Sequence, residues 1–181
     1  MTQYFSPFSL EKNLGKAYNE SMSLLPNDDD WGCLLDGDTM FLTPNYGKQL
    51  YDIVENYKNL NDIGLFTCLT NRTGNPYQRY NGVLSENSDL KNHRDIAYQL
   101  QKEFYLNISE IPRTISGHLM LIQKKIWKSV GGFKEEGILK IDNDFSKKII
   151  LSGKKVFLMK GLYIFHYYRL FEGKRDKTHL K

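Results

Sequence analysis

Two nearly continuous apolar runs constrain the fold of this chain more than any other feature. Trp31–Leu35 and Ile63–Thr70 carry few polar side chains, which is typical of strands buried on both faces of a sheet. Between them, Thr43 and Pro44 indicate the start of a helix. Its apolar positions form one stripe: Tyr46, Leu50, Ile53, Val54 and Tyr57. This order predicts an α/β fold with a largely parallel sheet flanked by helices.

The rest of the chain continues this alternation. The pattern predicts further strands at residues 1–6, 114–123, 156–159 and 162–167, and further helices at residues 12–25, 88–103, 124–130 and 143–151. Residues 71–87 are polar and rich in Asn and Gly, so we expect a loop there, with a mobile loop as one interpretation. No internal repeat or linker interrupts the 181 residues, so we expect one domain over residues 1–181.

Composition and charge exclude several classes of protein. A hydrophobic content of 40% with only 5 Pro excludes a disordered chain. The net charge of +4 is too small to predict a nucleic-acid partner. Basic residues gather loosely at 124–128, at 147–155 and in the tail at Lys174, Arg175 and Lys177. Solvated surface is the ordinary interpretation of these groups, and the alternative is attraction to phosphates or peripheral contact with an anionic membrane face.

The two cysteines bear on the cellular compartment. Cys33 and Cys68 each lie inside an apolar run, and two cysteines are too few for a disulfide framework. We therefore expect buried, reduced thiols in a cytoplasmic protein. The sequence also lacks a signal-like leader and any apolar run near the ~20 residues of a membrane span, which agrees with that expectation.

The most prominent chemical feature is the pair Asp36 and Asp38, separated only by Gly37, directly after the apolar run 31–35. Ligands of open α/β sheets bind at the carboxyl ends of strands. Two carboxylates there can hold a hard divalent cation, which in turn can bind a diphosphate. The alternative is a polar turn with no role in binding.

A second acidic pair and a histidine complete the candidate site. Asp142 and Asp144 stand at the start of a predicted helix, where either can cap the helix or serve as a general base. His166 lies where an apolar strand ends, and it is either a packed structural histidine or a metal ligand beside Asp38.

Four segments in this order resemble the family 2 glycosyltransferases of the GT-A fold, in a compact form of bacterial or bacteriophage type. They are Asn13-Leu-Gly-Lys-Ala-Tyr-Asn19 with Trp31-Gly-Cys-Leu-Leu-Asp-Gly-Asp38, then Gly117-His-Leu-Met-Leu-Ile122 with Trp127-Lys-Ser-Val-Gly-Gly-Phe133, then Asp142-Asn-Asp-Phe-Ser-Lys-Lys-Ile149 with Gly153-Lys-Lys-Val156, and finally His166. The resemblance covers about residues 2–169.

This resemblance implies a function and roles for the site residues. The chain would be a metal-dependent, inverting glycosyltransferase that moves a sugar from a nucleotide-diphosphate donor, with UDP as the expected nucleotide, to a hydroxyl acceptor that is a glycan, lipid-linked or of another kind. Asp36 would contact the donor, and Asp36, Asp38 and His166 would hold Mn²⁺ or Mg²⁺. Asp142 matches the catalytic base, with Asp144 as the alternative. The nucleoside base would lie by Tyr4, Phe5, Ser6 and Pro7, and Arg169 is within reach of phosphate in sequence terms.

Two other functions stay open at this point. Leu35-Asp-Gly-Asp-Thr39 resembles the nucleophile motif of haloacid-dehalogenase-type phosphatases, in which Asp36 would attack phosphorus and Asp38 would transfer the proton. A non-catalytic module that binds a sugar or a nucleotide is the third interpretation. The many aromatic residues also leave a homodimer open.

Overall fold

The computed structural model describes residues 1–167. Arg169 and the tail residues Lys174, Arg175 and Lys177 lie outside these residues. The strands are β1 (Thr2–Phe5), β2 (Trp31–Leu35), β3 (Thr39–Phe41), β4 (Ile63–Thr70), β5 (Ile108–Glu110), β6 (Leu119–Gln123) and β7 (Lys155–His166). The α-helices are α1 (Leu14–Ser23), α2 (Tyr46–Tyr57), α3 (Leu90–Phe104), α4 (Lys124–Ser129) and α5 (Ile141–Leu151), with two short 3₁₀ turns at Pro76–Gln78 and Tyr80–Gly82.

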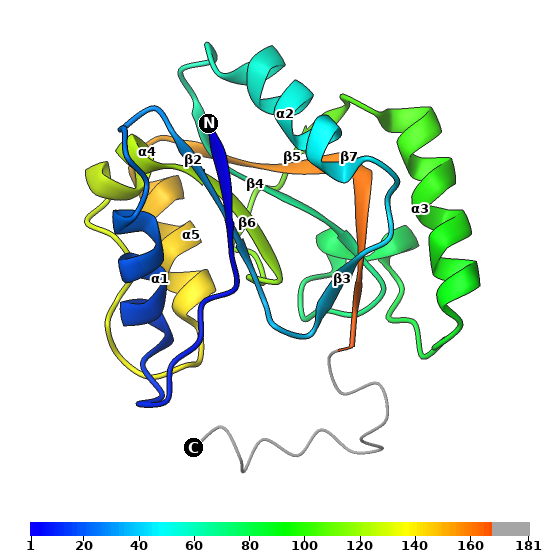
Figure 1. The fold of residues 1–181 in the computed structure, drawn as a ribbon, viewed down its shortest axis with the longest axis horizontal. Helices are drawn as coiled ribbons and strands as arrows, with labels where there is room; N and C mark the ends of the chain where they lie inside the picture. The colour runs from blue at the N-terminus through cyan, green and yellow to red at the C-terminus, as the bar shows by residue number, and fades with distance from the viewer. Residues whose placement is uncertain (168–181) are drawn as a thin grey trace.

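The strands form one mixed sheet in the order β1-β2-β6-β4-β7-β3, with β5 also paired to β7 (Figure 1). Only β1–β2 and β4–β7 are parallel pairs, and the other pairings of this sheet are antiparallel. The fold is therefore α/β as predicted, but the expectation of a largely parallel sheet is wrong. Antiparallel pairing enters through β6, which inserts between β2 and β4 and runs opposite to both, and through β3 and β5, which each pair antiparallel with β7.

The last strand is longer than expected. Two strands at 156–159 and 162–167 were predicted, and the structure has the single strand β7. Its pairing with β4 shifts between Met159 and Tyr163, where three residues bulge out of register, and Figure 1 shows the sharp bend that results. Gly161 lies in this bend, and a Cβ there would meet the carbonyl carbon and oxygen of Phe104 at under 3 Å. Bulges of this kind re-aim the strand that carries them.

Helices cover both faces of the sheet. One core cluster joins the buried side chains of α1, α3 and α5 with those of the sheet, among them Met22, Ala97 and Phe145. The other cluster packs α2 on the opposite face through Leu50, Ile53 and Val54. Cys33 and Cys68 lie in this second cluster as free, buried thiols, as the sequence predicted. None of the helices within residues 1–167 has both the length and the apolar character to cross a membrane.

The start of α2 differs from the prediction. The helix begins at Tyr46 after Asn45 rather than with Thr43 as its cap. The Thr43 hydroxyl is used elsewhere, because it donates to the carbonyl oxygen of Tyr163 at 3.0 Å and accepts the Tyr163 N–H at 3.2 Å. A residue predicted to cap a helix therefore fastens the segment after β3 to β7.

Residues 71–87 form a packed segment, so the interpretation as a mobile loop is not supported. Several of their polar side chains are buried, and their hydrogen bonds go to distant parts of the chain. Gln78 accepts the N–H of Ser116 at 2.8 Å and donates to the Thr67 hydroxyl at 2.7 Å. Asn75 donates to the carbonyl of Thr114 at 2.9 Å. Buried polar groups that are paired in this way order a segment instead of loosening it.

Candidate metal centre

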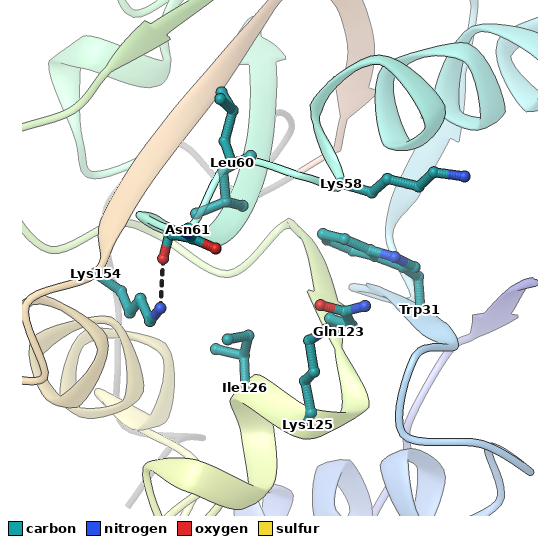
Figure 2. A pocket seen from close by; sticks show the side chains of 9 residues that line it. Trp31, Lys58, Leu60, Asn61, Gln123, Lys125, Ile126 and Lys154 are labelled. Carbon is teal, nitrogen blue, oxygen red and sulfur yellow. Dashed lines mark hydrogen bonds between the residues drawn. The ribbon is translucent and has the colours of Figure 1, made fainter.

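The two ends of the sheet differ in chemistry. At the end where β2 and β4 begin, a pocket of about 80 Å³ lies beside Trp31 and three lysines (Figure 2). These ammonium groups are already paired: Lys58 with Glu55, Lys125 with Asp29, and Lys154 with the carbonyl oxygen of Asn61. The residues that line this pocket include no carboxylate and no imidazole within the described chain, so it is not the candidate site.

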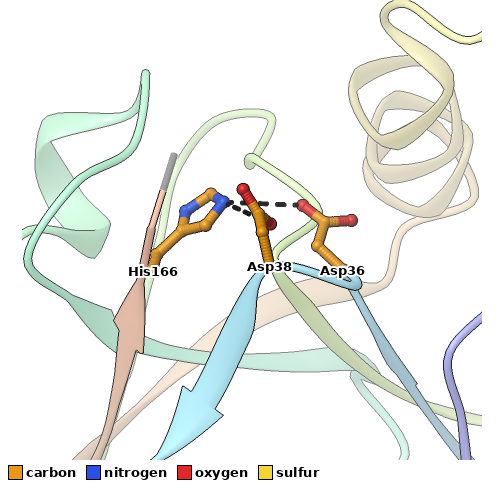
Figure 3. A group of neighbouring side chains, drawn as sticks. All are labelled: Asp36, Asp38 and His166. Carbon is orange, nitrogen blue, oxygen red and sulfur yellow. Dashed lines mark ion pairs between the residues drawn. The ribbon is translucent and has the colours of Figure 1, made fainter. Parts of the chain in front are cut away.

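Asp36, Asp38 and His166 meet at the opposite end (Figure 3). Asp36 directly follows β2, Asp38 directly precedes β3, and His166 is the last residue of β7. One ligand atom from each lies within 4.8 Å of the others. Nε2 of His166 is 3.1 Å from Asp38 Oδ1 and 4.0 Å from Asp36 Oδ2. The proximity that the sequence left conditional for His166 is therefore present.

Backbone pairing explains why residues so far apart in sequence converge. β3 pairs with β7 such that Thr39 stands opposite His166. The N–H of Tyr167 then donates to the carbonyl oxygen of Asp38 at 2.9 Å. The carbonyl oxygen of Asp36 accepts the hydroxyl of Thr39 at 2.7 Å, which closes the turn around Gly37. The short strand β3, which the sequence did not predict, is thus the element that brings the acidic turn to the histidine.

The His166 ring is held in one orientation. Its Nδ1 lies 2.8 Å from the carbonyl oxygen of Arg72, and because a carbonyl only accepts, Nδ1 carries the proton. The lone pair of a neutral ring is then on Nε2, which faces the carboxylates. A lone pair and two carboxylates repel one another unless a cation or a second ring proton lies between them. Metal-binding histidines commonly donate their other N–H to a carbonyl in this way.

The two carboxylates differ in electrostatic surroundings. Burial raises the pKa of Asp36 to about 6, opposed by His166 and by the Tyr18 hydroxyl and supported by the negative charges of Asp38 and Asp142. About 35% of the Asp36 side chain still reaches solvent. Burial also acts to raise the pKa of Asp38, but the hydrogen bond and charge of His166 outweigh it, so that this pKa is lowered.

These donors fit a divalent cation. Carboxylate oxygens suit Mg²⁺ and Mn²⁺, and a single imidazole nitrogen is compatible with Mn²⁺. A cation held by these three side chains would keep further coordination positions for water or for the oxygens of a bound molecule.

A pocket of about 170 Å³ adjoins the cluster and contains a third carboxylate. It lies between α1 and the start of α5, with Tyr18, Asp36, Gly117 and Asp142 among its lining residues. The Tyr18 side chain is almost fully buried, and its hydroxyl donates to Oδ1 of Asp36 at 3.4 Å. Asp36 is therefore shared between the cluster and this pocket, which links Asp142 to the candidate cation site.

The structure separates the two candidates for a general base. Asp142 Oδ2 accepts the N–H of Gly117 at 2.7 Å and its Oδ1 accepts the N–H of Asn143 at 2.8 Å. Burial raises its pKa, and these two N–H groups oppose that shift. Asp144 instead lies 3.7 Å from the ammonium group of Lys148, one turn along α5, and does not line the pocket. Neither side chain caps the helix, because the residue at the N-cap is Lys140.

Of the four residues expected to lie by a nucleoside base, Tyr4 and Phe5 lie on opposite faces of β1, and Ser6 and Pro7 follow this strand. Tyr4 is exposed and meets Phe41 and Tyr46 edge-on, at ring distances of 6.5 and 6.1 Å, and these two rings stack on each other at 3.8 Å. Phe5 packs instead against the core cluster of α1, α3 and α5. Ser6 approaches Gly37, in the acidic turn, while Pro7 is partly buried. Successive strand residues alternate between faces, so Tyr4 and Phe5 do not share one surface.

Sequence reasoning missed His118. Its ring is fully buried with its centroid 5.8 Å from that of His166. Nε2 donates to the carbonyl of Cys68 at 3.1 Å, whereas Nδ1 has no hydrogen-bond partner among residues 1–167. Burial lowers the pKa of His118 to about 3, and the neighbouring His166 acts in the same direction. Its place next to Gly117, within a segment that resembles a family motif, was the available signal.

Asn19, in the first resemblance segment, has a structural role. Its Oδ1 accepts the indole N–H of Trp127 at 2.9 Å and the N–H of Phe133 at 2.8 Å. Its Nδ2 donates to the Phe133 carbonyl at 3.0 Å. These bonds fasten the chain after α4 to α1, and this is the chain that leads to Asp142.

Models of known protein families and characterised proteins were compared with this sequence, and neither comparison gives a match. The function is therefore inferred from the arrangement of the site.

Proposed function

We propose that this chain is a metal-dependent, inverting glycosyltransferase with a GT-A-like fold, which moves a sugar from a nucleotide-diphosphate donor to a hydroxyl acceptor. The observation that carries the proposal is the convergence of Asp36, Asp38 and His166, with their ligand atoms within 4.8 Å and the His166 ring fixed with Nε2 toward the carboxylates. The sequence resemblance supports the same assignment through the order of its segments.

In this proposal the site residues have two separate roles, cation binding and proton removal. Asp36, Asp38 and His166 would hold Mn²⁺ or Mg²⁺, which would supply positive charge to stabilise the departing diphosphate. Asp142 removes the proton of the acceptor hydroxyl as general base, since it is the carboxylate that shares a pocket with Asp36. The activated hydroxyl attacks the anomeric carbon on the face opposite the leaving group, so the configuration at that carbon inverts. Gly117 orients Asp142 through its N–H.

Donor and compartment are part of the same proposal. UDP is the expected nucleotide. The aromatic side chains of Tyr4, Phe41 and Tyr46 form a surface on which the ring of its base could lie. A cytoplasmic location agrees with the free, buried Cys33 and Cys68.

Titration calorimetry tests the proposal. UDP and GDP are titrated into wild type and into Asp38→Ala, first with Mn²⁺ and then with EDTA. We expect binding of one nucleotide that requires both Mn²⁺ and Asp38. Asp29→Ala is the matched control, because Asp29 is an exposed carboxylate paired with Lys125 at the other end of the sheet, and this variant should bind as wild type does.

Other outcomes favour the alternatives. No binding of either nucleotide by wild type argues against a transferase, and metal-dependent hydrolysis of an aryl phosphate would then support the phosphatase in which Asp36 attacks phosphorus. Nucleotide binding without sugar transfer to any hydroxyl acceptor would support a non-catalytic binding module.

A further inference from the structure

Asn71, the first residue after β4, forms two hydrogen bonds with the backbone of His166. Its Oδ1 accepts the His166 N–H at 2.8 Å, and its Nδ2 donates to the His166 carbonyl at 3.2 Å. The Thr70 hydroxyl also donates to Asn71 Oδ1, at 3.1 Å. Only 1% of Asn71 is exposed, so these bonds are made away from competing water. An amide that pairs with both polar groups of one residue fixes that residue's position and its rotation about the chain.

This contact begins where the sheet stops. The ladder between β4 and β7 ends with Thr70 opposite Ile164, two residues before His166. Asn71 is the first residue after β4, so its side chain continues the pairing to the last residue of β7. The next residue, Arg72, accepts the Nδ1 proton of the His166 ring at 2.8 Å. Two adjacent residues therefore fix both the backbone and the ring of His166.

The segment that carries Asn71 is itself anchored. The carbonyl of Asn71 accepts the N–H of Ser85 at 3.0 Å, and the guanidinium of Arg72 donates to the Ser85 carbonyl at 3.1 Å. Arg72 also pairs with Glu86. These bonds hold residues 71 and 72 against the far end of the 71–87 segment. The two residues that fix His166 are therefore themselves fixed.

We propose that Asn71 is a positioning residue for the candidate cation site, which keeps His166 Nε2 directed at Asp38 before any ligand arrives. The inference rests on the proposed function, in that it takes Asp36, Asp38 and His166 as the cation ligands. Without Asn71 the His166 backbone loses these two hydrogen bonds, so the imidazole is held less firmly at its distance from the carboxylates. Partners that orient a ligand in this manner typically change metal affinity by about 10–100-fold when they are removed.

The test measures Mn²⁺ affinity directly, by electron paramagnetic resonance of free Mn²⁺, in wild type, Asn71→Ala and Asn71→Gln. The Ala variant removes the amide and the Gln variant misplaces it without changing charge. Asn75→Ala is the matched control, because Asn75 is also buried in this segment and also bonds backbone groups, those of Tyr77 and Thr114, but does not contact His166. We expect both Asn71 variants to lose about 10–100-fold in affinity for Mn²⁺ and Asn75→Ala to keep an affinity close to that of wild type.

A second measurement on metal-free wild type keeps the inference testable if Asn71→Ala does not fold. Nitrogen-15 NMR of the imidazoles should show Nδ1 of His166 protonated whether or not Nε2 also carries a proton, because the Arg72 carbonyl accepts from Nδ1. In Asn71→Gln a neutral His166 ring should share its proton between the two nitrogens. Wild-type affinity for Mn²⁺ that survives in both Asn71 variants overturns the inference alone, as does averaging of the His166 tautomers in wild type. Absence of Mn²⁺ binding by wild type overturns the proposed function as well.

Discussion

The backbone N–H of Gly117 donates to Oδ2 of Asp142 at 2.7 Å, and a side chain at position 117 would collide with the residue that it orients. A Cβ built on Gly117 lies 2.8 Å from the Cβ of Asp142, closer than two such carbons pack. Gly117 therefore serves Asp142 in two ways, as a hydrogen-bond donor and as open space. The carboxylate keeps its place in the pocket that it shares with Asp36 only while residue 117 is glycine.

Gly117→Ala is expected to lower sugar transfer at least tenfold, since a displacement of about 1 Å at a reacting group costs on the order of 10²-fold in rate. Nucleotide binding with Mn²⁺ should stay close to that of wild type, because Asp142 is not among the proposed cation ligands. Steady-state kinetics measures the loss of sugar transfer, and calorimetry measures the retained nucleotide binding. Gly74→Ala is the control, where the new Cβ would meet only the Ser116 hydroxyl at 3.5 Å. Equal activity of the two variants would remove the positional argument for Asp142.

Asp142→Asn is expected to lower turnover by about 10²–10⁴-fold, the usual contribution of a general base, while donor binding is retained. Asparagine keeps the shape of the side chain but has one acceptor oxygen, so it can accept only one of the N–H groups of Gly117 and Asn143. Retained donor binding in this variant would show that the site is intact, so that the loss of turnover reports on proton transfer. Asp144→Asn should stay within a few-fold of wild type, because Asp144 pairs with Lys148 outside the pocket. A single-turnover assay compares the two variants. A large loss in Asp144→Asn with near wild-type turnover in Asp142→Asn would assign the role of general base to Asp144.

Replacement of two helix glycines by alanine should change the stability of the protein in opposite directions. Alanine in a helix is favoured over glycine by about 0.5–1 kcal/mol, and Gly47→Ala in α2 should gain stability of that order, since its Cβ meets only Tyr4 Oη at 3.6 Å. Gly15→Ala in α1 places a Cβ 1.8 Å from the carbonyl oxygen of Lys134. That backbone has to move, so we expect a loss of about 1–3 kcal/mol, as for overpacked cores. Urea denaturation of both variants measures the difference, and a stabilised Gly15→Ala would show that the 134 segment yields freely.

The local pattern of the sequence predicted most helices and the central strands, because apolar stripes and runs depend only on nearby residues. It also placed Asp36 and Asp38 at a strand end and named His166 as their conditional neighbour. The direction of β6 was not predictable in this way, since a run buried on both faces looks the same in either direction. The short strand β3 carries no run long enough to detect, although its pairing with β7 assembles the cluster.

Polar composition was misleading at residues 71–87. Polar side chains predict exposure when their partners are unknown, but here the partners are distant: Gln78 bonds Ser116 and Asn71 bonds His166. Such contacts exist only once the sheet has formed, so no local pattern reveals them. The His118 ring is hidden for the same reason, because it is buried by strands far away in sequence.

His118 should make the metal-free protein lose stability in acid. Its pKa is about 3 in the folded protein, against an ordinary value of 6.5, because burial disfavours the charged ring. Between these values the unfolded chain binds the proton and the folded chain does not, so the free energy of unfolding falls as pH falls below about 6.5. From pH 7 to pH 4.5 this one group is expected to lower the free energy of unfolding by about 2–3 kcal/mol.

Urea denaturation at both pH values, with EDTA, measures this loss of stability. His118→Gln, whose side chain at position 118 cannot titrate, should lose less stability than wild type by that amount. Carboxylates that His118 does not influence, among them Asp36 with its raised pKa, contribute to both proteins alike and cancel in the comparison. If wild type and His118→Gln lose the same free energy of unfolding between the two pH values, His118 is already charged, or is hydrated, in the folded state.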